Sequence, residues 1–109
     1  MEDLSEIKYV KLNTVHLMKG KREKNTKLLK EFFEKIDRRV KGMKGYAIME
    51  SQGDPQETIV VTFWETKEDM DKYYRPDNSV LSEFILRAKF NFEKAPERKD
   101  YFVSKLDIY

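Results

Sequence analysis

The stretch Thr58-Ile-Val-Val-Thr-Phe-Trp-Glu-Thr-Lys-Glu-Asp-Met-Asp-Lys-Tyr-Tyr74 decides the fold of this chain. Its first seven residues are β-branched or aromatic, which predicts a buried strand that ends on the only tryptophan, Trp64. The next residues, Thr66-x-x-Asp69, resemble a capping box with Asp in place of the usual Glu. We therefore expect a strand that turns directly into an aromatic-rich helix. This helix should end near Arg75, because Pro76 disfavours helical geometry in the residue before it.

The segments before this stretch predict a strand, a helix and a second strand. Residues 9–18 alternate as a strand does, so that Asn13 and Val15 share one face while Leu12 and His16 share the other. An apolar stripe at helical spacing follows, and Asn25 or Thr26 is a suitable cap for that helix. The stripe consists of Leu28, Leu29, Phe32, Phe33, Ile36 and Val40. Residues 46–51 predict a strand that forms an antiparallel hairpin with residues 58–64.

The segments after the stretch predict a helix, a loop and a final strand. Asn78 or Ser79 is a suitable cap for a helix whose apolar positions run from Val80 to Ala88. Residues 91–99 read as a loop that contains Pro96, and residues 101–109 read as the last strand.

This β-α-β-β-α(α)-β order predicts an α+β, ferredoxin-like fold. Such a fold is a four-stranded antiparallel sheet with helices on one face. The strands hold more apolar positions than one helical layer can cover. A second copy packed sheet to sheet would bury the remainder, so we expect a homodimer that forms a dimeric α+β barrel.

Length and composition restrict the classes of function. The 109 residues predict one domain over 1–109, with a flexible N-terminus at 1–7. A net charge of +2 gives no reason to expect nucleic acid or an anionic membrane as partner. The chain has no cysteine and one histidine, so we expect no metal site within one chain. No apolar run suits a signal peptide or a membrane span, and the cytoplasm is the expected location.

Three motifs in order resemble the antibiotic-biosynthesis-monooxygenase superfamily, whose members are dimeric α+β barrels. The first is a strand that ends in Lys19-Gly20, and the second is the turn Gly42-Met43-x-Gly45. The third is the strand end Trp64-Glu-Thr-Lys-Glu68 before a helix. Together they span about residues 9–109, and the resemblance implies the same fold.

One branch of that superfamily degrades haem, and the resemblance to it is incomplete. Asn13 lies seven residues before Gly20, as does the branch's asparagine, which contacts the iron-bound oxygen. Tyr73 takes the place of the branch's tryptophan, nine residues after Trp64. The haem-ligating histidine has no counterpart, since its position falls near Phe84 or Ile85. Haem needs an axial ligand, and the sequence does not select one.

A second branch oxidises phenolic or anthrone-like aromatics with O₂ and without metal or flavin. The resemblance then implies a dry pocket that holds a planar aromatic and stabilises its anion. The residue types suited to this are Asn13, Trp64, Tyr73, Tyr74 and Arg87. A third branch includes quinol-type monooxygenases and proteins without proven chemistry.

The candidate site follows from these patterns. We predict Asn13, Tyr73 and Trp64 as the catalytic candidates, with Trp64 chiefly a marker of the fold. Tyr73 is favoured over Tyr74 as the cavity-facing residue, because neighbouring helical residues do not share a face. His16 has the opposite strand parity from Asn13 and should face the inter-sheet interior. The predicted substrate contacts are Tyr74, Phe84, Ile85 and Arg87.

Two functions remain open. One is oxidation by O₂ of a planar hydrophobic molecule, either haem or an aromatic phenol or quinol. It requires no cofactor, or haem as bound substrate or cofactor. The other is a non-catalytic ligand-binding or stress-response dimer of the same fold. A pocket too small for an aromatic ring would favour this second function.

Overall fold

The computed structural model describes residues 4–109, which form a single sheet and a helical layer. The strands are β1 Tyr9–His16, β2 Met43–Glu50, β3 Glu57–Trp64 and β4 Glu97–Phe102. The helices are α1 Arg22–Ile36, α2 Lys67–Tyr73 and α3 Ser79–Ala88, with 3-10 turns η1 Leu4–Glu6 and η2 Lys89–Asn91. Residues 1–3 of the predicted N-terminal segment lie outside the described residues.

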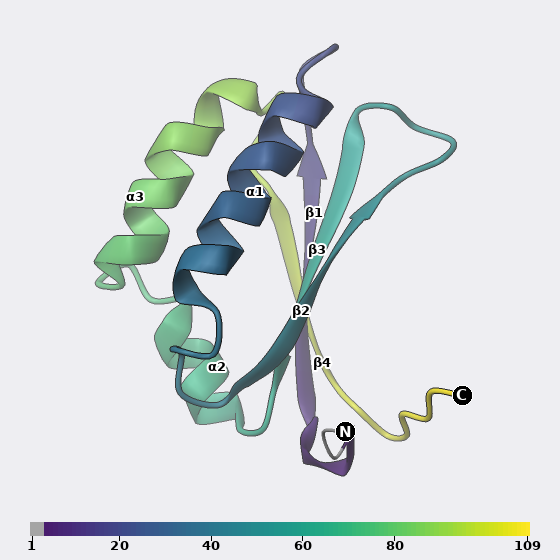
Figure 1. Cartoon of the computed structure of the whole chain (residues 1–109), viewed down its shortest axis with the longest axis vertical. Coiled ribbons are helices and arrows are strands. Elements are labelled where there is room, and N and C mark those ends of the chain that lie inside the picture. Colours follow the sequence, from purple (N-terminus) through teal and green to yellow (C-terminus); the bar gives the residue numbers. More distant parts are fainter. Residues whose placement is uncertain (1–3) are drawn as a thin grey trace.

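The four strands form one antiparallel sheet in the order β2-β3-β1-β4 (Figure 1). The two central strands are β1 and β3, and β4 returns from the far end of the chain to the edge beside β1. This confirms the predicted element order and the ferredoxin-like α+β fold.

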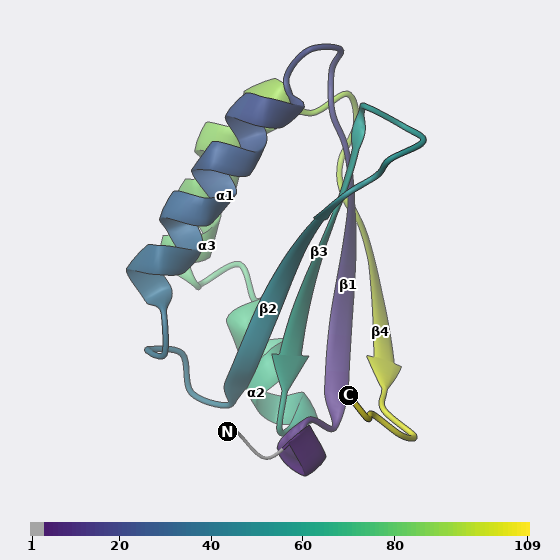
Figure 2. The same ribbon diagram turned by 45° about the vertical axis from the view of Figure 1, so that its right-hand side comes forward.

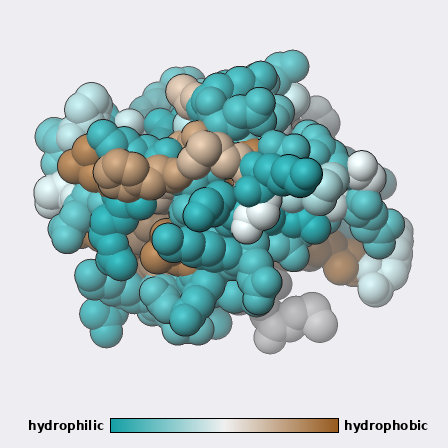
Figure 3. Space-filling view, turned by 90° about the horizontal axis from the view of Figure 1, so that it is seen from above, coloured by the Kyte–Doolittle hydropathy of each residue, from teal (hydrophilic) through white to brown (hydrophobic). Residues whose placement is uncertain are grey.

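Helices α1 and α3 lie side by side over one face of the sheet, while no element of the chain described here covers the other (Figure 2). Trp64, Leu17 and Met70 are completely buried between the layers. Seen from above, the end of the molecule where α1 begins is mostly hydrophilic, with a band of apolar side chains across it (Figure 3). Val80, Leu86 and Phe90 are exposed on or next to α3. No described helix is long and apolar enough to cross a membrane.

Strand register assigns each residue to one of two faces. Asn13 pairs with Val60, and both face the helices. Leu12 pairs with Val61, so these two face the uncovered side. His16 pairs with Glu57 on that same uncovered face, as its parity predicted.

The helix starts agree with the sequence in two of three cases. Thr66 Oγ1 accepts a hydrogen bond from the Asp69 N–H at 3.1 Å, and Asn78 Oδ1 accepts one from Leu81 N–H at 3.3 Å. The predicted cap of α1 at Asn25 or Thr26 is wrong, because the helix already begins at Arg22. Asn25 is instead buried within the first turns, where its Oδ1 lies 3.5 Å from Asn91 Nδ2.

The predicted last strand over residues 101–109 is also wrong, since β4 occupies Glu97–Phe102. Its register runs from Glu97 opposite Thr14 to Phe102 opposite Tyr9, where β1 begins. Beyond the bond from Val103 N–H to the Lys8 carbonyl, the tail has no strand among residues 4–109 left to pair with.

Candidate functional site

A small cavity of about 60 Å³ lies between the helical layer and the sheet. Side chains from α1, α3, β1, β3, β4 and the end of α2 form its wall. Most of them are apolar, and they include Val15, Leu29, Phe32, Phe33, Val60, Leu81, Phe84, Ile85 and Phe92. The polar groups of the wall are Asn13, Asn25, Tyr73, Tyr74 and Arg98.

Asn13 uses its whole amide within the protein. Its Nδ2 donates to the Val60 carbonyl at 3.0 Å and to Tyr74 Oη at 3.3 Å. Its Oδ1 accepts from Arg98 Nε at 3.1 Å. An amide nitrogen has only two hydrogens to donate, so Asn13 has no N–H left for a ligand.

Tyr74 stands at the centre of a polar network. Its hydroxyl lies 2.8 Å from Thr62 Oγ1, which also accepts from Trp64 Nε1 at 2.8 Å. The Arg98 guanidinium carbon lies 4.9 Å from the centroid of the Tyr74 ring, and Lys11 Nζ lies 4.5 Å from it. Two cations this close to one ring favour a fixed ring position.

Both cavity tyrosines are held in the neutral form. Burial raises the pKa of Tyr73, the neighbouring Tyr74 raises it further, and Arg98 offsets part of this rise. Burial also raises the pKa of Tyr74, while hydrogen bonds from Thr62 and Asn13 lower it in part. Each phenol therefore keeps its proton at neutral pH and is able to donate a hydrogen bond.

Five of the seven sequence-predicted site residues line the cavity: Asn13, Tyr73, Tyr74, Phe84 and Ile85. Trp64 is completely buried behind the cavity wall, with its ring centroid 5.2 Å from that of Tyr73. Arg87 is exposed on α3 and does not line the cavity.

The sequence favoured Tyr73 alone as the cavity-facing tyrosine, whereas both Tyr73 and Tyr74 line the cavity. Residues one apart on a helix are separated by about 100°, not 180°, so both can border one cavity. Tyr73 is the last residue of α2 and Tyr74 is its C-cap, and their rings meet edge to face at 4.9 Å.

Sequence reasoning missed Arg98. Its segment reads as a charged loop, and only the pairing of Arg98 with Asn13 across β4 and β1 brings it to the cavity. Residues 97–100 are all charged, so no alternation of apolar and polar residues marked this segment as a strand.

The residues present do not fit haem. Pockets for ligands of drug size measure roughly 300–1,000 Å³, whereas this cavity measures about 60 Å³. The chain's single histidine, His16, lies on the opposite face of the sheet and cannot reach the cavity. Among the described residues, no group of three His, Cys, Asp or Glu side chains is arranged for a metal ion.

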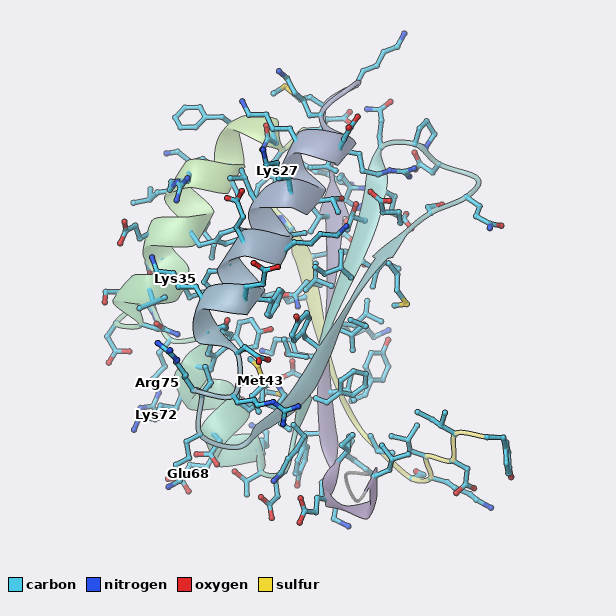
Figure 4. The ribbon with its side chains drawn as sticks, viewed as in Figure 1. Lys27, Lys35, Met43, Glu68, Lys72 and Arg75 are labelled. Atoms are coloured by element: carbon cyan, nitrogen blue, oxygen red, sulfur yellow. The ribbon has the colours of Figure 1, made fainter. Side chains whose placement is uncertain are left out.

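A second, wider groove of about 670 Å³ meets the cavity at Tyr73. It lies where the end of α1, α2 and the start of α3 come together, and Lys35, Arg39, Lys41 and Lys72 contribute positive charge to it. Figure 4 shows Lys35, Lys72 and Arg75 at this end of the helical layer. Tyr73 thus separates the apolar interior from a basic surface.

Comparison with known proteins agrees on the family. The family model "Antibiotic biosynthesis monooxygenase" matches residues 9–77, which is more than half of the chain. No curated protein sequence matches significantly.

Solved structures share the fold at low sequence identity. A conserved protein from Methanosarcina mazei has a TM-score of 0.75 at 16% identity, covering 89% of this chain and 93% of its own. A Nitrosomonas europaea protein, provisionally assigned as an antibiotic biosynthesis monooxygenase, has a TM-score of 0.77 at 14% identity, covering 89% and 90%. A provisional assignment of the same kind from Caulobacter crescentus gives 0.78 at 11% identity, covering 91% and 92%. Identities this low support the fold alone.

Proposed function

This chain belongs to the antibiotic biosynthesis monooxygenase family, and we propose that it oxidises a planar aromatic phenol or quinol with O₂ in the cavity. One observation carries the proposal. Asn13, Tyr73, Tyr74 and Arg98 line a cavity whose wall is otherwise mainly apolar. Such a mixture positions an aromatic ring by its faces and a ring oxygen by hydrogen bonds.

The reaction needs no external reductant. A phenol ring carbon loses its hydrogen and gains one oxygen atom of O₂ as a carbonyl. The second oxygen atom leaves as water with that hydrogen and the phenol hydrogen, so the substrate supplies all the electrons. The protein contributes by excluding water and by stabilising the negative charge that develops on the ring oxygen. Arg98 and the two tyrosines are the groups suited to that charge.

The size of the cavity sets a condition on this proposal. A cavity of about 150 Å³ binds benzene, while this one measures about 60 Å³, so an aromatic substrate requires its wall to move outward. Among the helices that form the wall, α3 has the smallest buried share, because only Leu81 and Ala88 are buried among its ten residues. We therefore propose that α3 shifts outward when a substrate binds.

We also propose that the protein is a homodimer formed through the uncovered sheet face. Leu12, Val61, Ile59, Met49 and Tyr101 share this face by register, and Met49 and Tyr101 are 48% and 45% exposed. Apolar side chains gathered on one sheet face are typical of a protein interface. The cavity lies on the opposite side of the sheet and stays intact in such a dimer.

Oxygen consumption tests the oxidation. Purified protein is incubated with hydroquinones and naphthols of increasing size, and O₂ uptake is followed with an electrode. We expect uptake that exceeds the spontaneous rate and drops at least tenfold in Arg98→Gln. Arg87→Gln, a change of the same kind outside the cavity, should leave the rate unchanged. Uptake that is the same in Arg98→Gln and the wild type would exclude this site.

The alternative is a non-catalytic ligand-binding dimer, and the small cavity volume is the observation that favours it. It predicts that the same compounds bind, as seen by quenching of Trp64 fluorescence, without any O₂ uptake above the spontaneous rate. Titration with hemin tests haem as a ligand separately. We expect no Soret shift, because the cavity does not fit haem.

A further inference from the structure

In each hydrogen bond of the network behind the cavity, the donor and the acceptor can be assigned. Trp64 begins the network, because an indole N–H donates and cannot accept. Its acceptor is Thr62 Oγ1 at 2.8 Å, and both side chains are buried. Trp64 therefore occupies one lone pair of the threonine hydroxyl.

The bond from Trp64 decides which of the two hydroxyls, Thr62 or Tyr74, donates to the other. The two hydroxyl oxygens lie 2.8 Å apart, and either one is able to donate. If Tyr74 donated, the Thr62 hydrogen would have no partner among residues 4–109, although Thr62 is only 1% exposed. A buried hydroxyl without a partner is strongly unfavourable, so Thr62 donates and Tyr74 accepts.

This leaves the hydroxyl hydrogen of Tyr74 without an acceptor in the protein. Tyr74 Oη already accepts from Thr62 and from Asn13 Nδ2, which together fill its lone pairs. Tyr74 lines the cavity, and no other partner of its hydroxyl is found among the described residues.

Arg98 adds the only positive charge to the cavity wall described here. Its Nε is bound to Asn13 Oδ1 at 3.1 Å, while its terminal nitrogens make no hydrogen bond within residues 4–109. An amine or another cation would be repelled by Arg98 at this wall. An oxygen acceptor with negative charge gains from both Tyr74 and Arg98.

We propose that Tyr74 donates a hydrogen bond to an anionic oxygen of the ligand, a phenolate or enolate, beside the Arg98 guanidinium. Trp64, Thr62 and Asn13 are positioning residues, since together they leave Tyr74 only the ligand as acceptor. This inference rests on the proposed function for the identity of the site. It gives the buried Trp64 a role in positioning Tyr74. It differs from the sequence-based expectation, in which Asn13 and Tyr73 were the polar contacts.

A binding experiment with 4-nitrophenol tests the relay without any turnover. The phenolate of this probe absorbs visible light, and its absorption band shifts when its oxygen accepts a hydrogen bond. We expect the wild type to bind the phenolate and shift the band, and to bind 4-nitroanisole, which has no ionisable oxygen, at least about tenfold more weakly.

Four variants separate a directed donor from a merely structural role. Tyr74→Phe should lose the band shift and at least about tenfold in affinity for the phenolate, while its affinity for 4-nitroanisole stays the same. Thr62→Val and Trp64→Phe should lose part of the shift, and Thr62→Ser should keep it. Arg87→Gln, outside the cavity, should match the wild type.

The proposal is overturned if Tyr74→Phe keeps the band shift, if 4-nitroanisole binds as well as the phenolate, or if the wild type binds neither probe. If Thr62→Val or Trp64→Phe does not fold, Tyr74→Phe with the two probes decides alone. Its outcome is independent of the oxidation. Absence of O₂ uptake with a Tyr74-dependent band shift would refute the proposed activity and support the relay.

Discussion

Gly42 and Asp69 approach each other so closely that position 42 has no room for a side chain. A Cβ built on Gly42 would lie 2.6 Å from the Asp69 Cβ and 2.7 Å from its Cγ. The Gly42 carbonyl also accepts a hydrogen bond from the Glu65 N–H at 3.0 Å. The turn after α1 is thereby fastened to the junction between β3 and α2, the same junction that identifies the fold in the sequence.

Replacing Gly42 with Ala should destabilise the protein more than the same change at Gly20. Both glycines have a left-handed backbone, with φ of +79° and +80°, but a Cβ at Gly20 would meet nothing within 4 Å. Gly20→Ala should therefore cost only the left-handed penalty, about 1–2 kcal/mol. Gly42→Ala should cost about 2–5 kcal/mol, because the clash with Asp69 is added. Urea unfolding of both variants measures the difference, and equal costs would contradict the close approach.

The stability of the protein should fall at alkaline pH. Burial raises the folded-state pKa of Tyr73 and Tyr74 above the ordinary value of 10.0. Above that pH the unfolded chain releases protons that the folded chain keeps, so the free energy of unfolding decreases as pH rises. The slope is about 1.4 kcal/mol per pH unit for each such tyrosine. Chemical unfolding from pH 9 to 11 should show this loss, and the loss should be smaller in Tyr73→Phe. A flat profile would exclude buried phenols.

Arg22 should hold the β2–β3 hairpin against the start of α1. Its Nη1 donates to the Ser51 carbonyl at 2.7 Å and to the Asp54 carbonyl at 2.9 Å. Arg22→Ala should cost about 1–3 kcal/mol, since hydrogen bonds from a charged donor are lost at a partly buried site. Amide exchange should become faster in the hairpin. Lys24→Ala, an exposed change on the same helix, should leave hairpin exchange as it is, and unchanged exchange in Arg22→Ala would argue against this role.

A single negative charge introduced on the uncovered sheet face should prevent dimerisation. Met49 is 48% exposed in the single chain, so Met49→Glu should leave the monomer folded and place a carboxylate in the interface. Light scattering after size exclusion should show a dimer for the wild type and a monomer for Met49→Glu. Leu86→Glu is the matched control, because Leu86 is 58% exposed on the helical side. A wild-type monomer would refute the proposed interface.

Local rules were sufficient for most of the fold. The Thr66 cap and the alternation in β1 depend on neighbouring residues, and the structure confirms both. The α1 cap failed because Asn25 bonds a residue 66 positions away, which no local pattern contains. The last strand failed for a similar reason, since its limits are set by where β1 begins.

Residues of the candidate site also divide into those that local patterns predict and those that depend on distant contacts. Asn13 and Tyr73 follow from spacing within motifs, and both line the cavity. Arg98 was not predictable in this way, because its contact with Asn13 spans 85 residues. The role proposed for Trp64 could not be predicted either, since its acceptor Thr62 lies on the same strand and only the third residue, Tyr74, lines the cavity.

The stretch that matches the family ends at residue 77, and the only cation on the cavity wall of the described chain stands at residue 98. The residue proposed to contact the ligand's charge thus lies outside the stretch that marks the family. If Arg98 contacts the ligand as proposed, changes confined to β4 should alter which compound the protein prefers. An engineer who seeks new substrates should therefore randomise β4 first and leave the strand–helix junction untouched.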